Sequence, residues 1–255
     1  MAEIDLNSDL GESFGPWVMG EDAAMLSVVT SANVACGGHA SDPETMFATL
    51  AEAAARGVVV GAHPGYADRE GFGRRVIPMA PAEIGRMVAA QIGALQGVAA
   101  QAGVPVRYVK PHGALGNLAA ADADVAAAIA AAVRAISPDL AVLAISGTAL
   151  ERAARTAGLQ VFSEIFADRA YLPNGQLVPR SRPDAMVHDP VAGAERLLRF
   201  LDTGRMPVVD GADPIRLEAQ SICVHGDSAG AVARAVEVRR ALTEAGVILR
   251  PFLPA

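Results

Sequence analysis

Short apolar runs alternate with longer segments of mixed polarity from one end of the chain to the other. Runs of this length, rich in Val, Ile and Ala and bounded by glycine or polar residues, are typical of buried strands. The pattern predicts seven strands and a weaker eighth: 3–6, 32–36, 58–61, 106–109, 140–145, 160–165, 221–225 and, more weakly, 247–250.

The segments between these runs have the length and end signals of helices. Residues 43–56 follow Asp42, a good N-cap, start with Pro43 at the first helical position and stop at Gly57. Two further segments carry apolar residues at helical spacing and end at a glycine, so helices are predicted over 82–102 and 228–245.

A strand followed by a helix, repeated along the chain, predicts parallel strands joined by helical crossovers. The 255 residues suit one α/β barrel, and no linker or fixed repeat divides them, so we predict a single (β/α) barrel domain over 1–255. Because 52% of the residues are hydrophobic and only 4% aromatic, its core is expected to be aliphatic. Two stretches rich in Gly, Pro and Arg, 64–81 and 167–189, are predicted to be long functional loops.

Polar residues gather where the predicted strands end. In a (β/α) barrel all strands point their carboxyl ends at one face, where the active site is built. Four of the five histidines are therefore expected at one mouth, whereas His188 lies in a loop and is expected at the surface. The residues that follow the strands are Asn7, Asp9, Glu12, His39, His63, Lys110, His112, Asn117, Glu164, Asp168, Arg169, His225 and Asp227.

Composition and charge exclude several classes of protein. The net charge is −7 and no basic run is present, which argues against a nucleic-acid surface. No stretch approaches the ~18 apolar residues that cross a membrane, and the first residues lack the pattern of a signal peptide. Cys36 and Cys223 lie far apart in apolar runs, as free buried thiols do. We expect a cytoplasmic protein.

Lys110 is the only lysine in the chain, and it stands directly before Pro111, His112 and Gly113. All other basic side chains are arginine, which keeps its charge at any working pH. A lysine amine can be neutralised by its surroundings and then act as a base or a tunable donor. Because perturbed groups cluster at active sites, this position predicts a functional lysine.

Four histidines, one lysine and several carboxylates at one mouth indicate hydrolytic chemistry. A neutral imidazole or desolvated lysine can take a proton from water while a protonated partner stabilises an oxyanion. Phosphate loops of the GxxxxGK and GxGxxG kinds are absent. A divalent metal at the His/Asp cluster is possible but not favoured, because Asp9, His39, His63 and His112 match no defined metal motif by spacing.

Six long segments together resemble the LamB/YcsF family, whose members form the A subunit of the bacterial ATP-dependent 5-oxoprolinase. The match runs in order through nearly the whole chain. The segments are IDLNSDLGESFG (4–15), SANVACGGHASDP (31–43), GAHPGYADREGFGRR (61–75), KPHGALGN (110–117), EIFADRAY (164–171) and SICVHGD (221–227).

The resemblance implies a distorted seven-stranded (β/α) barrel of the glycoside hydrolase/deacetylase kind. It also implies one component of an enzyme that opens the lactam ring of 5-oxo-L-proline to L-glutamate, using ATP (with Mg) as co-substrate and partner subunits B and C. ATP would phosphorylate the amide oxygen, and the missing nucleotide motif is explained if activation occurs on the partners. The sequence leaves a homo-oligomer open.

On this basis we assign expected roles. Asp9 or His63 is the expected general base for water, and Lys110 and His112 are expected to stabilise developing negative charge. Arg74 or Arg75 is a candidate for the substrate carboxylate, because a guanidinium pairs with it in bidentate fashion. The other residues expected to bind or orient substrate are Asn7, Glu12, His39, Asn117, Glu164, Arg169, His225 and Asp227.

The sequence departs from the family pattern at three places near the expected site. The family typically has Cys-Gly-Phe-His-Ala-Gly where this chain has Gly38 and Ser41, and a tyrosine where it has Gly116. Two aromatic rings are missing, each worth about 150–250 Å² of covered surface. We therefore expect a wider pocket mouth.

Two other functions stay open at this point. Fold analogy allows a metal-dependent amidohydrolase or deacetylase that acts alone. A non-catalytic subunit that presents substrate to its partners is also consistent with the sequence.

Overall fold

The computed structural model describes residues 2–226 and 230–254. In this part of the chain seven parallel strands close into a barrel, because β9 pairs with both β6 and β1. An eighth strand, β10, pairs with the first residues of β1 beside the ring. The strands are β1 (Glu3–Leu10), β2 (Ser31–Ala35), β3 (Val59–His63), β4 (Val106–Val109), β5 (Ala141–Ile145), β6 (Val161–Phe166), β9 (Ser221–Cys223) and β10 (Ile248–Leu249).

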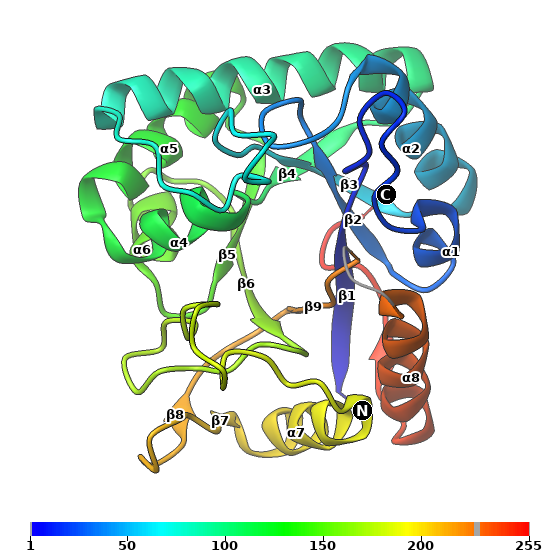
Figure 1. Cartoon of the computed structure of the whole chain (residues 1–255), viewed down its shortest axis with the longest axis vertical. Helices are drawn as coiled ribbons and strands as arrows, with labels where there is room; N and C mark the ends of the chain where they lie inside the picture. The colour runs from blue at the N-terminus through cyan, green and yellow to red at the C-terminus, as the bar shows by residue number, and fades with distance from the viewer. Residues whose placement is uncertain (1, 227–229, 255) are drawn as a thin grey trace.

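Helices surround the barrel, with α3 on one side and α7 and α8 on the opposite side (Figure 1). A short antiparallel hairpin, β7 (Arg205–Met206) and β8 (Ile215–Arg216), follows α7. None of the described helices combines the length and the apolar character that a bilayer crossing requires. The helices are α1 (Asp22–Leu26), α2 (Pro43–Arg56), α3 (Pro81–Ala102), α4 (Gly113–Ala121), α5 (Ala123–Ile136), α6 (Ala149–Thr156), α7 (Pro190–Thr203) and α8 (Ala231–Glu244).

The predicted barrel and all eight predicted strands are confirmed, with ends shifted by a few residues. Helix α2 has the predicted bounds, since the Asp42 carboxylate accepts the Thr45 N–H and Gly57 adopts a left-handed φ of 66°. The helix expected over 228–245 is described from residue 231 onward, because 228 and 229 lie outside the described residues. The hairpin was not predicted, since its strands are too short to show a pattern.

The expected aliphatic core lies between the strands and the helices. Leu6 and Leu10 of β1 point outward into it and pack with residues such as Leu50 of α2 and Ile92 of α3. At the amino-terminal end of the barrel, Phe252 from the segment after β10 packs against Tyr108 and Phe162, with ring centroids 5.0 and 4.7 Å apart. Apolar side chains therefore close that end.

Beyond this apolar end, the inside of the barrel is lined by polar side chains. Successive strand residues face opposite sides, so Asp5, Asn7 and Asp9 of β1 share the inner face. Asp5 accepts hydrogen bonds from Ser31 and Ser221 on the neighbouring strands. A ladder of polar side chains thus leads from the closed end to the carboxyl ends of the strands.

Candidate active site

The carboxyl ends of β1, β3, β4, β6 and β9 surround a cavity of about 550 Å³, within the range of roughly 300–1,000 Å³ that small-molecule sites occupy. It contains most of the residues expected at the barrel mouth. Its polar lining is Asp9, Glu12, His63, Arg74, Lys110, His112, Asn117, Thr148, Glu164, Arg169, Arg180, Ser181 and His225.

Lys110 lies at the centre of a buried network below the cavity. Its ammonium is 3.1 Å from Asp9 Oδ1 and 3.0 Å from Glu164 Oε2. It also donates to Asn7 Oδ1 at 3.2 Å and approaches Cys223 Sγ at 3.1 Å. The only lysine of the chain thus joins side chains from β1, β6 and β9.

The electrostatics of this network correct one expectation. Burial by itself would lower the pKa of Lys110, but Asp9 and Glu164 outweigh it and hold that pKa well above 10.5. Burial likewise opposes ionisation of Asp9, but His63 and Lys110 outweigh it and hold its pKa well below 3.8. Lys110 is therefore a fixed positive charge, not a neutral base.

Side chains that the sequence did not mark as functional hold this network in place. Asn33 Nδ2 donates to Asn7 Oδ1 at 2.7 Å and to Asp9 Oδ1 at 2.9 Å, and the Tyr108 hydroxyl donates to Asn33 Oδ1 at 2.6 Å. Asn33 was overlooked because it sits inside an apolar run. The signal in the sequence was a single polar residue inside a predicted buried strand, and the structure places it opposite Asp9.

Asp5 lies deeper, where burial raises its pKa to about 6 although Ser221, Ser31 and Thr30 donate to it. The unfolded chain ionises this carboxyl above about pH 3.8 and the folded chain only above about pH 6, so stability falls as pH rises through this interval. The free energy of unfolding of Asp5→Asn, measured relative to that of the natural protein, should therefore rise by about 2–3 kcal/mol as the pH is raised from 4 to 7. Urea unfolding at several pH values measures this gain.

The matched control is Asp202→Asn, which removes an exposed carboxylate on α7. Its stability should follow that of the natural protein across the same pH range. If the difference between Asp5→Asn and the natural protein stays constant with pH, Asp5 does not titrate as described.

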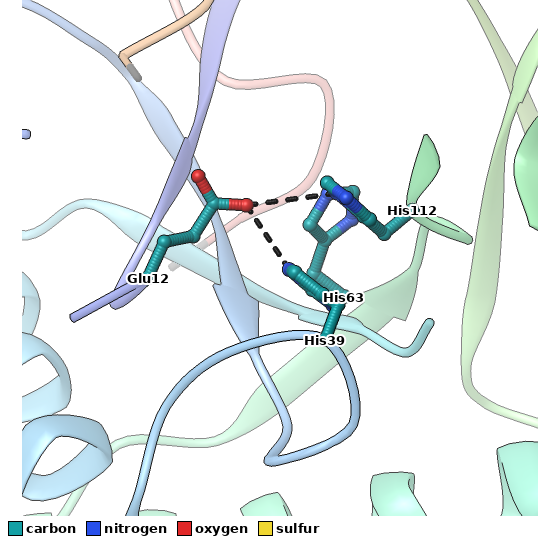
Figure 2. Close-up of side chains that lie close together, drawn as sticks. All are labelled: Glu12, His39, His63 and His112. Carbon is teal, nitrogen blue, oxygen red and sulfur yellow. Dashed lines mark hydrogen bonds and ion pairs between the residues drawn. The ribbon is translucent and has the colours of Figure 1, made fainter. Parts of the chain in front are cut away.

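A second cluster lies beside the first and joins Glu12, His39, His63 and His112 (Figure 2). Glu12 Oε1 is 3.0 Å from His39 Nε2 and 3.6 Å from His112 Nδ1. The His39 and His112 rings stack in parallel with centroids 3.6 Å apart. These donors are of the types that hold a divalent metal ion.

Hydrogen bonds determine which nitrogens of the cluster carry protons. His112 Nε2 lies 2.8 Å from the Phe72 carbonyl, which only accepts, so Nε2–H donates there. Burial lowers the pKa of His112 to about 3, with His63 nearby adding to the effect. Neutral His112 therefore has no second N–H to donate to an oxyanion, so this geometry does not favour the charge-stabilising role expected for it.

His225 forms a third group with Asp168, which follows β6. Its Nδ1 is 2.8 Å from both Asp168 carboxylate oxygens, and its ring stacks on Phe166 with centroids 5.6 Å apart. Burial would raise the pKa of Asp168, but His225 outweighs it and lowers that pKa. Asp168 was not chosen as a site residue from the sequence, although its place after a strand end was the signal that could have found it.

Three residues expected to bind substrate do not line the cavity: Asn7, His39 and Arg75. Asn7 lies beneath Lys110, and His39 lies behind Glu12. Arg75 pairs with Asp68, its Nε 3.0 Å from Asp68 Oδ2. Arg74 does reach the cavity, whereas the expected Asp227 lies outside the described residues.

The wider mouth expected at Gly38 is wrong. A Cβ there would lie 2.5 Å from Gln91 Oε1 and 2.6 Å from the Gly65 carbonyl, so Gln91 occupies the space of the missing ring. Gly116 does line the cavity, but a Cβ there would lie 2.6 Å from the Pro111 carbonyl. Ser41, at the third departure, adopts a φ of 77°, which glycine favours.

Gly38→Ala is expected to lower the free energy of unfolding by about 1–3 kcal/mol, because overpacking forces neighbours apart. The contact with the Gly65 backbone cannot be relieved by a side-chain rotation. Urea unfolding measures the loss, with Gly93→Ala as control, since a Cβ at Gly93 meets nothing within 4 Å. Equal stability of the Gly38 and Gly93 variants would contradict the prediction.

Fold and site together define a parallel (β/α) barrel with a buried, charged pocket at the carboxyl ends of its strands. The chain belongs to the LamB/YcsF family, which it matches over residues 4–255.

Individual relatives match along their full length. The chain is 54% identical over 252 residues to the third 5-oxoprolinase A subunit of Pseudomonas syringae pv. tomato, covering 99% of this chain and 98% of that protein. It is 55% identical over 249 residues to the 5-oxoprolinase A subunit of Paracidovorax citrulli, covering 98% and 99%. Among solved structures, the lactam utilization protein of Thermus thermophilus superposes with a TM-score of 0.92 at 43% identity, covering 98% of this chain and all of that one.

Proposed function

We propose that this chain is the A subunit of an ATP-dependent 5-oxoprolinase, which hydrolyses 5-oxo-L-proline to L-glutamate together with partner subunits B and C. The observation that carries the proposal is the full-length similarity to proteins named as A subunits of 5-oxoprolinase. The segments that resemble the family contribute Asp9, Glu12, His63, Lys110 and His225 to the cavity. We keep the cytoplasm as the expected compartment, because ATP is available there.

The chemistry explains the need for ATP. A lactam is stable in water, and phosphorylation of its amide oxygen makes the carbonyl carbon electrophilic. Water then adds to that carbon, the carbon–nitrogen bond breaks, and the ring nitrogen takes up a proton and leaves as the amine. A second water hydrolyses the resulting acyl phosphate to L-glutamate and inorganic phosphate. The sequence lacks the phosphate-binding loops, so we assign ATP and Mg to the partners and the hydrolytic half to this chain.

His225 is the base that this geometry favours. Its Nδ1–H donates to Asp168, which leaves Nε2 as an acceptor for a proton from water. Asp9, one of the two bases expected from the sequence, is engaged by Lys110 and Asn33. We keep Asp9 and Lys110 at the reaction centre as a fixed pair of charges that polarises substrate and water.

His63, the other base expected from the sequence, has its acceptor nitrogen against His112 rather than against open cavity. For the substrate carboxylate we keep Arg74, because it lines the cavity whereas Arg75 does not.

Reconstitution tests the proposal directly. The purified chain is mixed with its subunits B and C, and glutamate formed from 5-oxoproline is measured with and without ATP. We expect glutamate only when all three subunits and ATP are present. No glutamate from the complete mixture would contradict the function, and ATP hydrolysis by this chain alone with 5-oxoproline would contradict the division of labour.

A second candidate is a metal-dependent amidohydrolase that acts alone, and the His/Glu cluster favours it. It predicts hydrolysis of small amides by the isolated chain, lost on treatment with a chelator and restored by zinc or manganese. Activity that needs the partners and ATP would exclude it.

A further inference from the structure

Two imidazole nitrogens face each other inside the second cluster: His63 Nε2 and His112 Nδ1 lie 3.0 Å apart. The other nitrogen of each ring is held by a backbone carbonyl. His63 Nδ1 lies 2.6 Å from the Lys110 carbonyl, and His112 Nε2 lies 2.8 Å from the Phe72 carbonyl. Carbonyls accept only, so these outer nitrogens carry the hydrogens. When both rings are neutral, the two facing nitrogens present lone pairs, and His63 Nε2 also lies 3.4 Å from the Asp9 carboxylate.

Two lone pairs at this distance repel each other unless a positive centre lies between them. Glu12 supplies a third atom that could bind such a centre, since its carboxylate oxygen Oε1 is 3.6 Å from His112 Nδ1 and points toward the cluster (Figure 2). Ligands at about 2.0–2.2 Å from one zinc ion in tetrahedral geometry stand about 3.3–3.6 Å from each other. The Glu12–His112 separation of 3.6 Å lies within this range, and the His63–His112 separation of 3.0 Å is slightly shorter, so a shared ion requires the two rings to move apart by a few tenths of an ångström.

His39 also lies close to these three ligand atoms, but its contacts favour a hydrogen bond to Glu12 over direct binding of the ion. Its Nε2–H donates to Glu12 Oε1 at 3.0 Å, and its buried Nδ1 has no hydrogen-bond partner. If Nε2 bound a metal, Nδ1 would carry a buried hydrogen without an acceptor, which is rarer than an unpaired acceptor. Glu12, His63 and His112 line the cavity, whereas His39 does not.

We propose that His63 Nε2, His112 Nδ1 and Glu12 hold one divalent cation of the zinc class, with an open coordination position toward the cavity. Two histidines and a glutamate with an open position are a ligand set of catalytic zinc sites. The carbonyl that fixes each ring is the outer contact that orients metal-binding histidines. The inference does not depend on the proposed substrate or on the partner subunits.

Metal binding to the isolated chain tests the site without any activity assay. The protein is stripped with a chelator, and zinc is titrated by calorimetry, with bound metal counted by mass spectrometry. We expect one zinc per chain, and about 100-fold or greater loss of affinity in His63→Ala and His112→Ala. His188→Ala, which removes the exposed loop histidine, should bind as the natural protein does.

Glu12→Gln keeps the side-chain shape and guards against variants that fail to fold, with circular dichroism as the check on folding. It should weaken zinc binding, and the cobalt-substituted protein should lose its tetrahedral absorption bands. The proposal is overturned if the stripped protein takes up no zinc, which would leave a shared proton between the two rings. It is also overturned if folded His63, His112 and Glu12 variants all bind zinc as the natural protein does.

Discussion

Lys110→Met should lower the free energy of unfolding by about 3–5 kcal/mol at neutral pH, because it leaves buried carboxylates without their counter-charge. Asp9 and Glu164 both lie within 3.1 Å of the Lys110 ammonium, and all three side chains are at least nine-tenths buried. Methionine matches the length of the lysine stem, so the loss reports the charge rather than a cavity. Urea unfolding measures it.

The loss should depend on pH in a defined direction. The folded pKa of Lys110 is raised, so its stabilisation is fully present below about pH 10.5 and is lost as pH rises through that folded pKa. The folded pKa of Asp9 is lowered, so its stabilisation is present above about pH 3.8 and is lost as pH falls through that folded pKa. The deficit of the variant should therefore shrink in acid, where its carboxylates become protonated.

The control is Arg56→Met, which breaks an exposed ion pair with Glu52 one helical turn away. Exposed pairs of this kind contribute only about 0.3–0.5 kcal/mol. Adding Glu164→Gln to Lys110→Met should recover part of the stability, because one buried charge is removed. A Lys110 variant as stable as the Arg56 variant would show that the network is not charged as described.

His225→Gln should lower kcat for ATP-dependent ring opening in the reconstituted complex by about 10²–10⁴-fold, the usual range for a general base. Glutamine can still donate to Asp168 but cannot accept and hold a proton. The His225 side chain lines the cavity and keeps about 11% of its surface exposed, and glutamine is of similar size, so the fold should survive the change. Steady-state glutamate formation measures the effect, with the thermal unfolding midpoint as the check on structure.

The variant Asp168→Asn tests whether Asp168 orients the His225 ring for catalysis or only stabilises the fold. It retains a polar partner for His225 but removes the carboxylate that fixes the ring tautomer, so kcat should fall while KM changes little. It should also alter the pH profile of kcat. His188→Gln, outside the cavity, should leave both constants unchanged, and full activity of the His225 variant would remove it from the reaction centre.

The sequence predicted the barrel because the apolar runs of strands and the helical spacing of apolar residues are both patterns among neighbouring residues. Strand runs and helix ends, such as Asp42 before α2 and Gly57 after it, are fixed by neighbouring residues along the chain. The order of residues along the chain likewise showed which predicted strands end in polar residues. The alternation of residues along β1 could not show that Asp5, Asn7 and Asp9 point into the barrel. Which face of a strand points inward depends on which side of the sheet the helices cover.

The charge state of Lys110 and the tautomers in the histidine cluster were decided only by the tertiary structure. The sequence identified Lys110, His63 and His112 as candidates by their place after strands, and it gave no account of what surrounds them. Burial and partners far away in the chain, such as Glu164 for Lys110 and the Phe72 carbonyl for His112, determine where protons reside. Residue identity and order are written along the chain, whereas protonation follows from distances that only folding creates.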